Sequence, residues 1–363
     1  MSKVLMLADA HIGVPNRTSD IFWALRCARE YAKQNSIDTV LVLGDLFHDR
    51  QAIGVDTMCS AHNFLSDTKH KYGQNWVVFP GNHDMFLKHS WEVNSLIPFS
   101  GLITLINGIK CLKIEEVNFW ILPFISSESA YMNVLSKLET KIGPDDVLLT
   151  HIGVRNASLN TCFLLDHWTV VDFSESKFKQ VYTGHFHNYQ QVGNNVWYPG
   201  SLIPFNFSEG DVEHGFLEYD LDTRTHKFVD IWECGADYFP EEAAPPQYNT
   251  LHDSLLAEKG SADVAGRALR VALTRDYTAN EQAEMRAKLL EMGAKSVRFM
   301  NLSVDEPPQL SVAQANLLTA DRLFEKFIEA DEKGTAGLQH SLLKRMNLEI
   351  ITEGDEIYNK SCD

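Results

Sequence analysis

The stretch Thr39-Val-Leu-Val-Leu-Gly44-Asp45-Leu-Phe-His48-Asp49 changes abruptly from apolar to polar residues. Its first five residues predict a strand that is buried on both faces, and Gly44 followed by Asp45 predicts a turn at the end of that strand. Similar short apolar runs predict further buried strands along the chain. They lie at Val4–Ala8, Trp76–Phe79, Phe119–Leu122, Val147–Thr150 and Gln180–Thr183.

Segments with helical spacing separate several of these predicted strands. They are Ile21–Gln34, Val55–Tyr72 and Ser127–Ile142. Strands that alternate with helices predict an α/β fold in which helices cover the sheets. Later apolar segments, such as Val196–Tyr198 and Phe216–Tyr219, are joined by short turns and predict antiparallel strands. We therefore expect a layered α/β architecture with mixed sheets.

A change of composition divides the chain near residues 235–250, which carry three prolines and an acidic pair. This composition predicts a linker that follows a main domain of residues 1–234. A strand, a helix and a second strand are predicted within residues 251–306, which favours a small second domain. Residues 307–363 begin with two prolines and continue with apolar residues at helical spacing, which predicts a helical tail.

The overall composition limits the class of protein. Of 363 residues, 44% are apolar and 22% are charged, which excludes a disordered or fibrous chain. Six scattered cysteines without a C-x-x-C pair favour a reducing compartment over a disulfide framework. No stretch approaches the ~18 uncharged apolar residues of a membrane span, and the first residues lack the pattern of a signal peptide. We expect a cytoplasmic protein that does not bind a membrane.

The charge balance is strongly acidic. The chain carries 32 basic and 49 acidic residues, a formal net charge of -17, and neither residues 1–234 nor residues 235–363 form a basic module. A chain of this kind repels nucleic acid and anionic membranes on average, which excludes a stand-alone cationic binder. Two bound divalent cations would reverse the sign of the potential locally and make one patch attractive to phosphate.

Polar residues that can bind metal ions follow five of the predicted strands. They are Asp9, His11, Asp45, Asn82, His83, Asp84, His151, His185 and His187. Mixed nitrogen and oxygen donors suit Mn²⁺, Fe²⁺ or Zn²⁺ better than Mg²⁺ or Ca²⁺. There are too many donors for one tetrahedral site, but the number suits two ions that share a bridging carboxylate, for which Asp45 is the natural candidate.

Each motif by itself has a simpler explanation. An Asp-x-His pair or a Gly-Asp pair is common in turns and caps, and a lone His151 is more often a buried, hydrogen-bonded histidine than a ligand. The Gly184-His185-Phe186-His187 segment is more specific, because alternate residues of an extended segment face the same side. The joint occurrence of all the motifs, each after its own strand, favours a metal centre over these local explanations.

The ordered motifs D-x-H, G-D, G-N-H-D, H and G-H-x-H resemble those of calcineurin-like metallophosphoesterases from about Lys3 to His187. More narrowly, Gly44-Asp45-Leu46-Phe47-His48 resembles the SbcD-type nuclease subunit, including phage-encoded versions, which works with an SMC-like ATPase of the SbcC type. This resemblance implies a layered α-β-β-α sandwich at residues 1–234, an α+β capping domain at 251–306 and ATPase-binding helices at 307–363.

The resemblance also implies roles for the individual site residues. One metal ion would be bound by Asp9, His11, Asp45 and His187, and the second by Asp45, Asn82, His151 and His185, with Mn²⁺ as the expected ion. His83 would face the substrate and either stabilise the scissile phosphate or protonate the leaving oxygen. Asp84 would hold an imidazole in the required tautomer. Arg50 is either a phosphate contact or an ordinary surface charge.

The function implied is that of a metal-dependent DNA exonuclease or endonuclease in a repair and recombination complex. Its location would be the cytoplasm, or the host cytoplasm for a phage-encoded version. The family's homodimer would use helices such as Val55–Tyr72 or the segment Trp91–Pro98. Basic residues within 251–306 are either surface charges or contacts to DNA phosphates. Two alternatives remain open, namely a phosphoesterase for small or cyclic nucleotides and a scaffold subunit that binds a partner.

Overall fold

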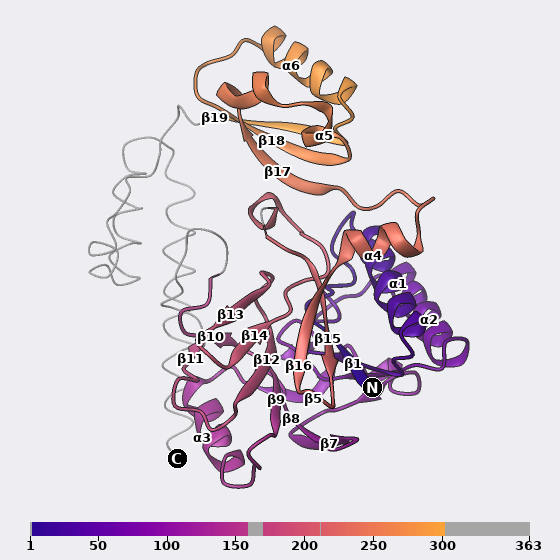
Figure 1. The fold of residues 1–363 in the computed structure, drawn as a ribbon, viewed down its shortest axis with the longest axis vertical. Coiled ribbons are helices and arrows are strands. Elements are labelled where there is room, and N and C mark those ends of the chain that lie inside the picture. Colours follow the sequence, from indigo (N-terminus) through magenta and orange to yellow (C-terminus); the bar gives the residue numbers. More distant parts are fainter. Residues whose placement is uncertain (1, 159–169, 211, 302–363) are drawn as a thin grey trace, which may run out of the picture. The chain divides into compact units, whose positions relative to one another are not determined.

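The computed structural model describes residues 2–158, 170–210 and 212–301 (Figure 1). The helical tail predicted at residues 307–363 lies outside the described residues. Two six-stranded sheets dominate the part of the chain before residue 231. The first sheet has the order β16-β15-β1-β2-β3-β6, and the second has the order β13-β14-β12-β9-β8-β7.

The first sheet is mostly parallel, because β1, β2, β3 and β6 run in one direction while β15 and β16 form an antiparallel hairpin at its edge. Its strands are β1 (Lys3–Leu7), β2 (Thr39–Val42), β3 (Asn75–Val78), β6 (Thr104–Leu105), β15 (Gly215–Asp220) and β16 (Thr225–Asp230). In the second sheet β14, β12, β9 and β8 are parallel, and β13 and β7 pair antiparallel at the edges. Its strands are β7 (Lys110–Ile114), β8 (Val117–Leu122), β9 (Val147–His151), β12 (Gln180–Gly184), β13 (Gln190–Val192) and β14 (Val196–Tyr198).

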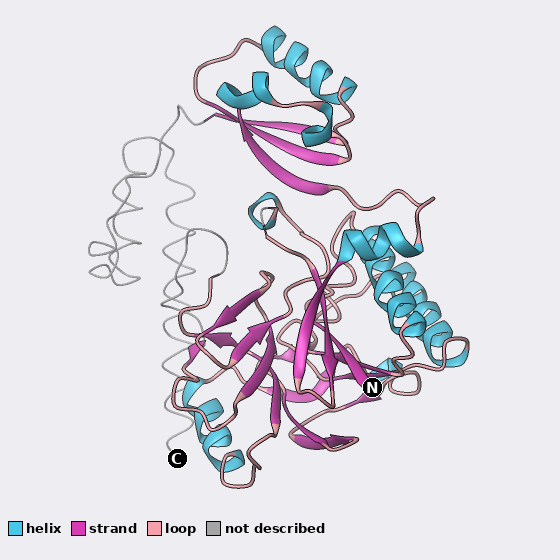
Figure 2. Ribbon diagram, in the orientation of Figure 1, coloured by secondary structure: helices cyan, strands magenta, loops and turns pink. Residues whose placement is uncertain are grey.

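Three apolar layers hold the sheets and helices together. Figure 2 shows the helices and strands that these layers join. Side chains from both sheets, among them Met6, Leu41 and Tyr182, form the layer between the sheets. Helices α1 (Thr18–Gln34), α2 (Val55–His70) and α4 (Ile231–Tyr238) pack on the outer face of the first sheet. Helix α3 (Glu128–Leu138) packs on the outer face of the second sheet. The prediction of a mixed α/β fold is confirmed, and the observed layers have the order α-β-β-α.

Residues 247–301, called here the β17–β19 unit, form a three-stranded parallel sheet with its own apolar core. Its elements are β17 (Gln247–His252), η3 (Asp253–Glu258), α5 (Ser261–Val264), β18 (Arg267–Leu273), α6 (Ala279–Glu291) and β19 (Ser296–Asn301). The strand, helix and strand predicted from the sequence correspond to β18, α6 and β19. No pattern in the sequence indicated β17, and α4 extends into the predicted linker, so the division into domains stays a prediction.

The remaining elements are short and connect the main ones. They are β4 (Met85–Leu87), β5 (Ser90–Asn94), η1 (Ile97–Phe99), β10 (Gly153–Val154), β11 (Val170–Val171) and η2 (Phe207–Glu209). Among the residues that the structure describes, none of the helices combines the length and the apolarity that a bilayer crossing requires.

Strand β15 contains a buried carboxylate that contacts residues of β1, α1 and β16. Glu218 is 5% exposed and accepts hydrogen bonds from Lys3 Nζ and Tyr31 Oη, each at 2.9 Å. Lys227 Nζ on the neighbouring strand lies 3.3 Å from the same carboxylate. Burial raises the pKa of Glu218, but the two hydrogen bonds and the lysine charges outweigh burial, so that the pKa lies below its ordinary value of 4.5.

We predict that Glu218→Gln lowers the free energy of unfolding by about 1–2 kcal/mol at neutral pH, because an amide satisfies these donors poorly. The pKa is lowered by folding, so the stabilisation is present above the unfolded-state pKa and disappears as the pH falls through the folded-state pKa. Urea denaturation of both proteins at about pH 7 and about pH 3.5 measures this difference. An equal difference at both pH values would contradict the role of the ionised carboxylate.

Candidate metal centre

The carboxyl ends of strands from both sheets meet at one rim, and all seven predicted metal ligands lie there. Asp9 and His11 follow β1, Asp45 follows β2, and Asn82 follows β3 in the first sheet. His151 ends β9, and His185 and His187 follow β12 in the second sheet. Parallel strands bring these ends together because their carboxyl ends share one edge.

The backbone around this rim is held in unusual conformations. Asp9, His11 and Asp45 have φ values of 50°, 49° and 50°, which few non-glycine residues adopt. Gly44 has a φ of 86°, and a Cβ there would lie 2.4 Å from His151 Nδ1. A Cβ on Gly81 would lie 2.2 Å from Asp45 Oδ1. The two glycines therefore allow the loops to approach each other closely, and strain of this kind is typical of functional sites.

Asp9, His11 and His187 form one group of potential ligands whose donor atoms lie within 4.8 Å of one another. The Nε2 atoms of His11 and His187 face each other at 3.1 Å. His187 Nδ1 lies 3.1 Å from a carboxylate oxygen of Glu209 and donates its proton to it, which leaves Nε2 with a lone pair in the neutral ring. His11 Nδ1 is buried without a hydrogen-bond partner.

Asp9, Asp45 and His151 form a second group. His151 is fully buried, and its Nδ1 donates to the carbonyl of Leu43 at 2.8 Å. In the neutral ring its Nε2 therefore carries a lone pair, yet this atom lies 3.0 Å from Asn82 Oδ1 and 3.3 Å from Asp45 Oδ2, both of which are acceptors. A proton or a metal cation between these atoms satisfies all three.

His185 extends the second group. Its Nδ1 lies 2.8 Å from Asn82 Oδ1, so that Asn82 faces His185 and His151 together. The backbone N–H of His185 donates to both carboxylate oxygens of Asp9 at 3.0 Å, which fixes Asp9 at the rim. Asp45 lies between the two groups, because its Oδ2 is 3.8 Å from His11 Nε2 and 3.3 Å from His151 Nε2.

The electrostatics of these buried groups depend on one another. Burial opposes ionisation of Asp45, but His151 and His11 hold its pKa well below its ordinary value. Burial also opposes a charge on His151, but Asp45 outweighs it and raises the pKa of His151 to about 9. Burial and the charge of His151 lower the pKa of His185 to about 3. In the absence of metal, one proton on His151 therefore compensates the Asp45 carboxylate.

These residues fit divalent cations. Carboxylate oxygens, an amide oxygen and imidazole nitrogens with free lone pairs converge on two adjacent positions, and such mixed donors suit Mn²⁺, Fe²⁺ or Zn²⁺. A cation would replace the compensating proton near His151 and would separate the facing nitrogens of His11 and His187. The assignment of each ligand to a particular ion stays a prediction.

His83 and His48 line the same rim beside the ligand groups. The backbone N–H of His83 donates to Asp45 Oδ1 at 2.7 Å, and its ring Nδ1 donates to the His48 carbonyl at 2.6 Å. The His48 ring stacks on the His83 ring at 5.5 Å, and both rings contact His11 edge-on. His48 belongs to the Gly-Asp-Leu-Phe-His motif, but the sequence assigned it no role, because its proximity to His83 arises from the fold.

Asp84 connects two of the loops that carry the ligands. It is fully buried, and its carboxylate accepts backbone N–H bonds from Leu46, Phe47 and Gly81 and a hydroxyl bond from Ser95. These bonds connect the loops after β2 and β3. The predicted bond from Asp84 to an imidazole is not among the hydrogen bonds found in the described residues. Burial and the charge of Asp45 raise the pKa of Asp84 to about 7, although the backbone bonds oppose this rise.

Glu209 is a further residue that the sequence did not single out. It is 4% exposed on η2, and its carboxylate contacts His187. It lies 22 residues beyond His187 in an irregular segment, so no periodic pattern indicated it. Arg50 is partly exposed, and its predicted role as a phosphate contact is untested.

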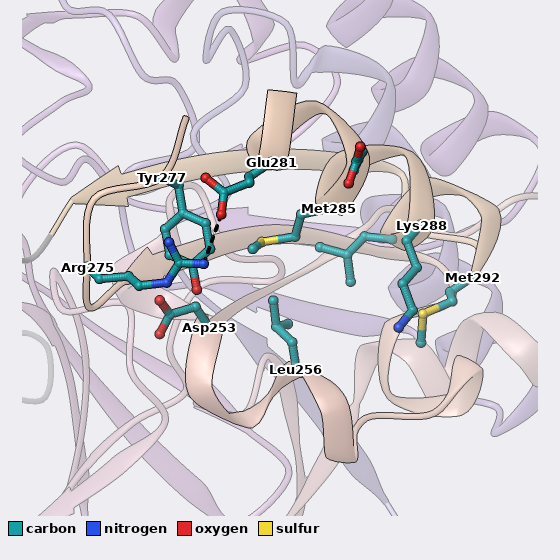
Figure 3. A pocket seen from close by; sticks show the side chains of 10 residues that line it. Asp253, Leu256, Arg275, Tyr277, Glu281, Met285, Lys288 and Met292 are labelled. Atoms are coloured by element: carbon teal, nitrogen blue, oxygen red, sulfur yellow. Dashed lines mark hydrogen bonds and ion pairs between the residues drawn. The ribbon is translucent and has the colours of Figure 1, made fainter. Parts of the chain in front are cut away.

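A cavity of about 360 Å³ lies elsewhere, within the β17–β19 unit, and is lined by none of the ligand residues (Figure 3). Its floor contains Leu256 and Met285, and at its edge Arg275 lies over the ring of Tyr277 and pairs with Glu281.

A family model for calcineurin-like phosphoesterases matches residues 2–189, which is more than half of the chain. The chain therefore belongs to this family of phosphoester hydrolases, as the motifs indicated. The match contains every one of the predicted ligand residues.

Individual relatives are more distant. Exonuclease subunit 1 of Enterobacteria phage T4 is 27% identical over 256 residues, which are 62% of this chain and 67% of that protein. A protein of Invertebrate iridescent virus 6 that is named as a phosphoesterase is 23% identical over 224 residues, with 59% of this chain and 74% of that protein covered. Among solved structures, an anchor protein of the inner membrane complex of Plasmodium is 11% identical and has a TM-score of 0.43, with 63% of this chain and 84% of that chain covered. At this TM-score the structural likeness adds no argument.

We predict that Mn²⁺ raises the melting temperature of the wild-type protein and that Asp45→Asn removes most of this rise. Binding to the folded state alone stabilises a protein by about 2.7 kcal/mol at a metal concentration of 100 Kd. Differential scanning calorimetry with and without Mn²⁺ measures the effect, with Asp67→Asn on the surface of α2 as the control for the lost charge. An equal rise in Asp45→Asn and wild type would show that Asp45 does not hold the ions.

Proposed function

We propose that the protein is a two-metal phosphodiesterase that cleaves DNA, the nuclease subunit of an SbcC/SbcD-like repair and recombination complex. The observation that carries this proposal is the position of Asp45 between two groups of buried ligands, with distances of 3.8 Å to His11 and 3.3 Å to His151. A carboxylate in this position can bridge two ions about 3.5–4 Å apart, the spacing used for in-line displacement at phosphorus.

In this proposal each ion has four protein ligands. One ion takes Asp9, His11, Asp45 and His187, and the other takes Asp45, Asn82, His151 and His185. The distances from His187 to His11 and from Asn82 to His151 and His185 support this division. Mn²⁺ is the proposed metal, because the donors are a mixture of imidazoles, carboxylates and one amide.

The divalent ions would supply an activated water and neutralise the charge that develops on the phosphate. The protein's own residues position the substrate and move the proton. His83 directs Nδ1–H to the His48 carbonyl, which leaves Nε2 for the substrate, and Nε2 can deliver a proton to the leaving oxygen when the ring is protonated on both nitrogens. His48 stacks on His83 and limits its rotation. Asp45 accepts the backbone N–H of His83 and thereby couples this residue to the ligands.

DNA is proposed as the substrate because of two sequence features. The Gly44–His48 motif resembles that of SbcD-type nucleases, and the T4 relative is named an exonuclease subunit. The net charge of -17 implies that DNA affinity is weak and sensitive to salt unless a partner contributes. We therefore also propose an SMC-like ATPase as the partner, with the segment 307–363 as its binding site.

A homodimer is proposed through α2 or through the segment Trp91–Pro98. Apolar side chains are exposed along both, with Val55 77% and Val93 59% exposed.

We predict that the full-length protein with Mn²⁺ cleaves linear duplex or single-stranded DNA and bis-p-nitrophenyl phosphate. His83→Ala should lower the rate on DNA by about 10²- to 10⁴-fold, because general acid catalysis contributes this much. His89→Ala, an exposed histidine between β4 and β5, is the matched control and should leave the rate unchanged.

The outcomes of this experiment separate the alternatives. Cleavage of only the small ester would contradict the nuclease and favour a phosphoesterase for small nucleotides. Absence of any cleavage, with and without an ATPase partner, would contradict enzymatic function and favour a scaffold subunit. Equal rates in His83→Ala and wild type would contradict the role of His83.

A further inference from the structure

The short turn η2 and its flanking residues contact both the metal centre and the β17–β19 unit. Towards the rim, the Phe205 ring contacts the rings of His11 and His187 edge-on at 5.4 and 5.3 Å, and Glu209 contacts His187.

The carboxylate of Glu209 is held from several sides. It accepts hydrogen bonds from the backbone N–H of Phe205 at 2.8 Å and from the side chain of Asn206 at 2.7 Å. The backbone carbonyl of Glu209 accepts a bond from His214 Nε2 at 2.9 Å, and His214 is itself fully buried. The carboxylate is therefore fixed in place before it accepts the Nδ1–H of His187.

This bond determines which nitrogen of His187 is available. A carboxylate that accepts from Nδ1–H fixes the ring orientation and leaves the Nε2 lone pair directed at His11 and the proposed ion. Carboxylate-histidine-metal arrangements of this type make the imidazole a stronger ligand.

The other side of η2 faces the β17–β19 unit. The ring of Phe207 contacts that of Tyr248 edge-on at 4.7 Å, and the guanidinium groups of Arg270 and Arg298 lie 5.3 and 6.0 Å from the Phe207 ring. Gly210 lies so close to the Tyr248 backbone that a Cβ would overlap its carbonyl oxygen. Arg17, in the loop that follows the first ligands, donates to the Tyr248 hydroxyl.

We propose that Glu209 is a positioning residue that fixes His187 for metal binding, and that η2 makes this arrangement depend on the contact between Phe207 and the β17–β19 unit. This inference rests on the proposed two-metal centre but not on DNA as the substrate. A displacement of Tyr248 would move the turn that carries Glu209, and the ion bound by His187 would then lose its oriented ligand.

The experiment measures Mn²⁺ binding to the full-length protein by electron paramagnetic resonance. Glu209→Gln is expected to weaken one of two Mn²⁺ sites about 10- to 100-fold, the range found for residues that orient metal ligands. Glu218→Gln is the matched control, because it alters a second buried glutamate that bonds Lys3 and Tyr31 away from the rim. It should lower stability without changing Mn²⁺ affinity.

A second readout is independent of metal. Nitrogen NMR of labelled histidines in the metal-free protein should show His187 protonated at Nδ1 in the wild type and a mixture of tautomers in Glu209→Gln. Equal Mn²⁺ affinity in Glu209→Gln and wild type would overturn the inference. A wild type that binds no pair of Mn²⁺ ions would instead overturn the proposed function, so the two failures are distinguishable.

The connection to the β17–β19 unit is tested by Phe207→Ala. This variant should weaken Mn²⁺ binding less than Glu209→Gln does. The fold-loss of Mn²⁺ affinity in the double variant should be smaller than the product of the two single fold-losses, because both substitutions act through the same turn. Unchanged Mn²⁺ affinity in Phe207→Ala, or effects that multiply in the double variant, would overturn the connection.

Discussion

The buried carboxylate of Asp45 is the constraint on which the rest of the rim depends. It is 2% exposed and lies between imidazoles from both sheets, and an isolated buried anion of this kind is costly. His151 compensates it when protonated, and its own Nδ1–H is already committed to the Leu43 carbonyl. Because Nε2 of His151 faces two further acceptors, a divalent cation is a better partner than a proton. The buried negative charge of this one side chain therefore accounts for a cation at the rim.

The fold provides this arrangement by placing the ends of parallel strands from two packed sheets at one rim. A Cβ at Gly44 would overlap His151, and a Cβ at Gly81 would overlap Asp45, so both positions require glycine. Asp84 connects the two loops that carry these glycines by accepting backbone N–H bonds. Asp9, His11 and Asp45 keep positive φ values that the surrounding bonds must maintain. Packing between the sheets therefore holds ligands in place that the local sequence would not hold alone.

The sequence predicted the strand ends well, because apolar runs followed by Asp, Asn or His leave a local pattern. It predicted the buried strands β1, β2, β9 and β12 to within about two residues. It did not identify Glu209, because the contact with His187 joins an irregular segment to a strand end through tertiary packing. It also missed β17, because Gln247–His252 lacks a buried apolar run and becomes a strand by pairing with β18. It did not indicate the hydrogen bonds of Asp84 either, since Asp84 accepts them from backbone N–H groups that no residue pattern reveals.

The most direct test of this account is a crystal structure of the full-length protein grown with Mn²⁺, with anomalous scattering measured near the manganese absorption edge. Two anomalous peaks about 3.5–4 Å apart, with one oxygen of Asp45 on each or one oxygen shared by both, are predicted. A single peak, or two peaks of which only one contacts Asp45, would contradict the claim that this carboxylate bridges two ions.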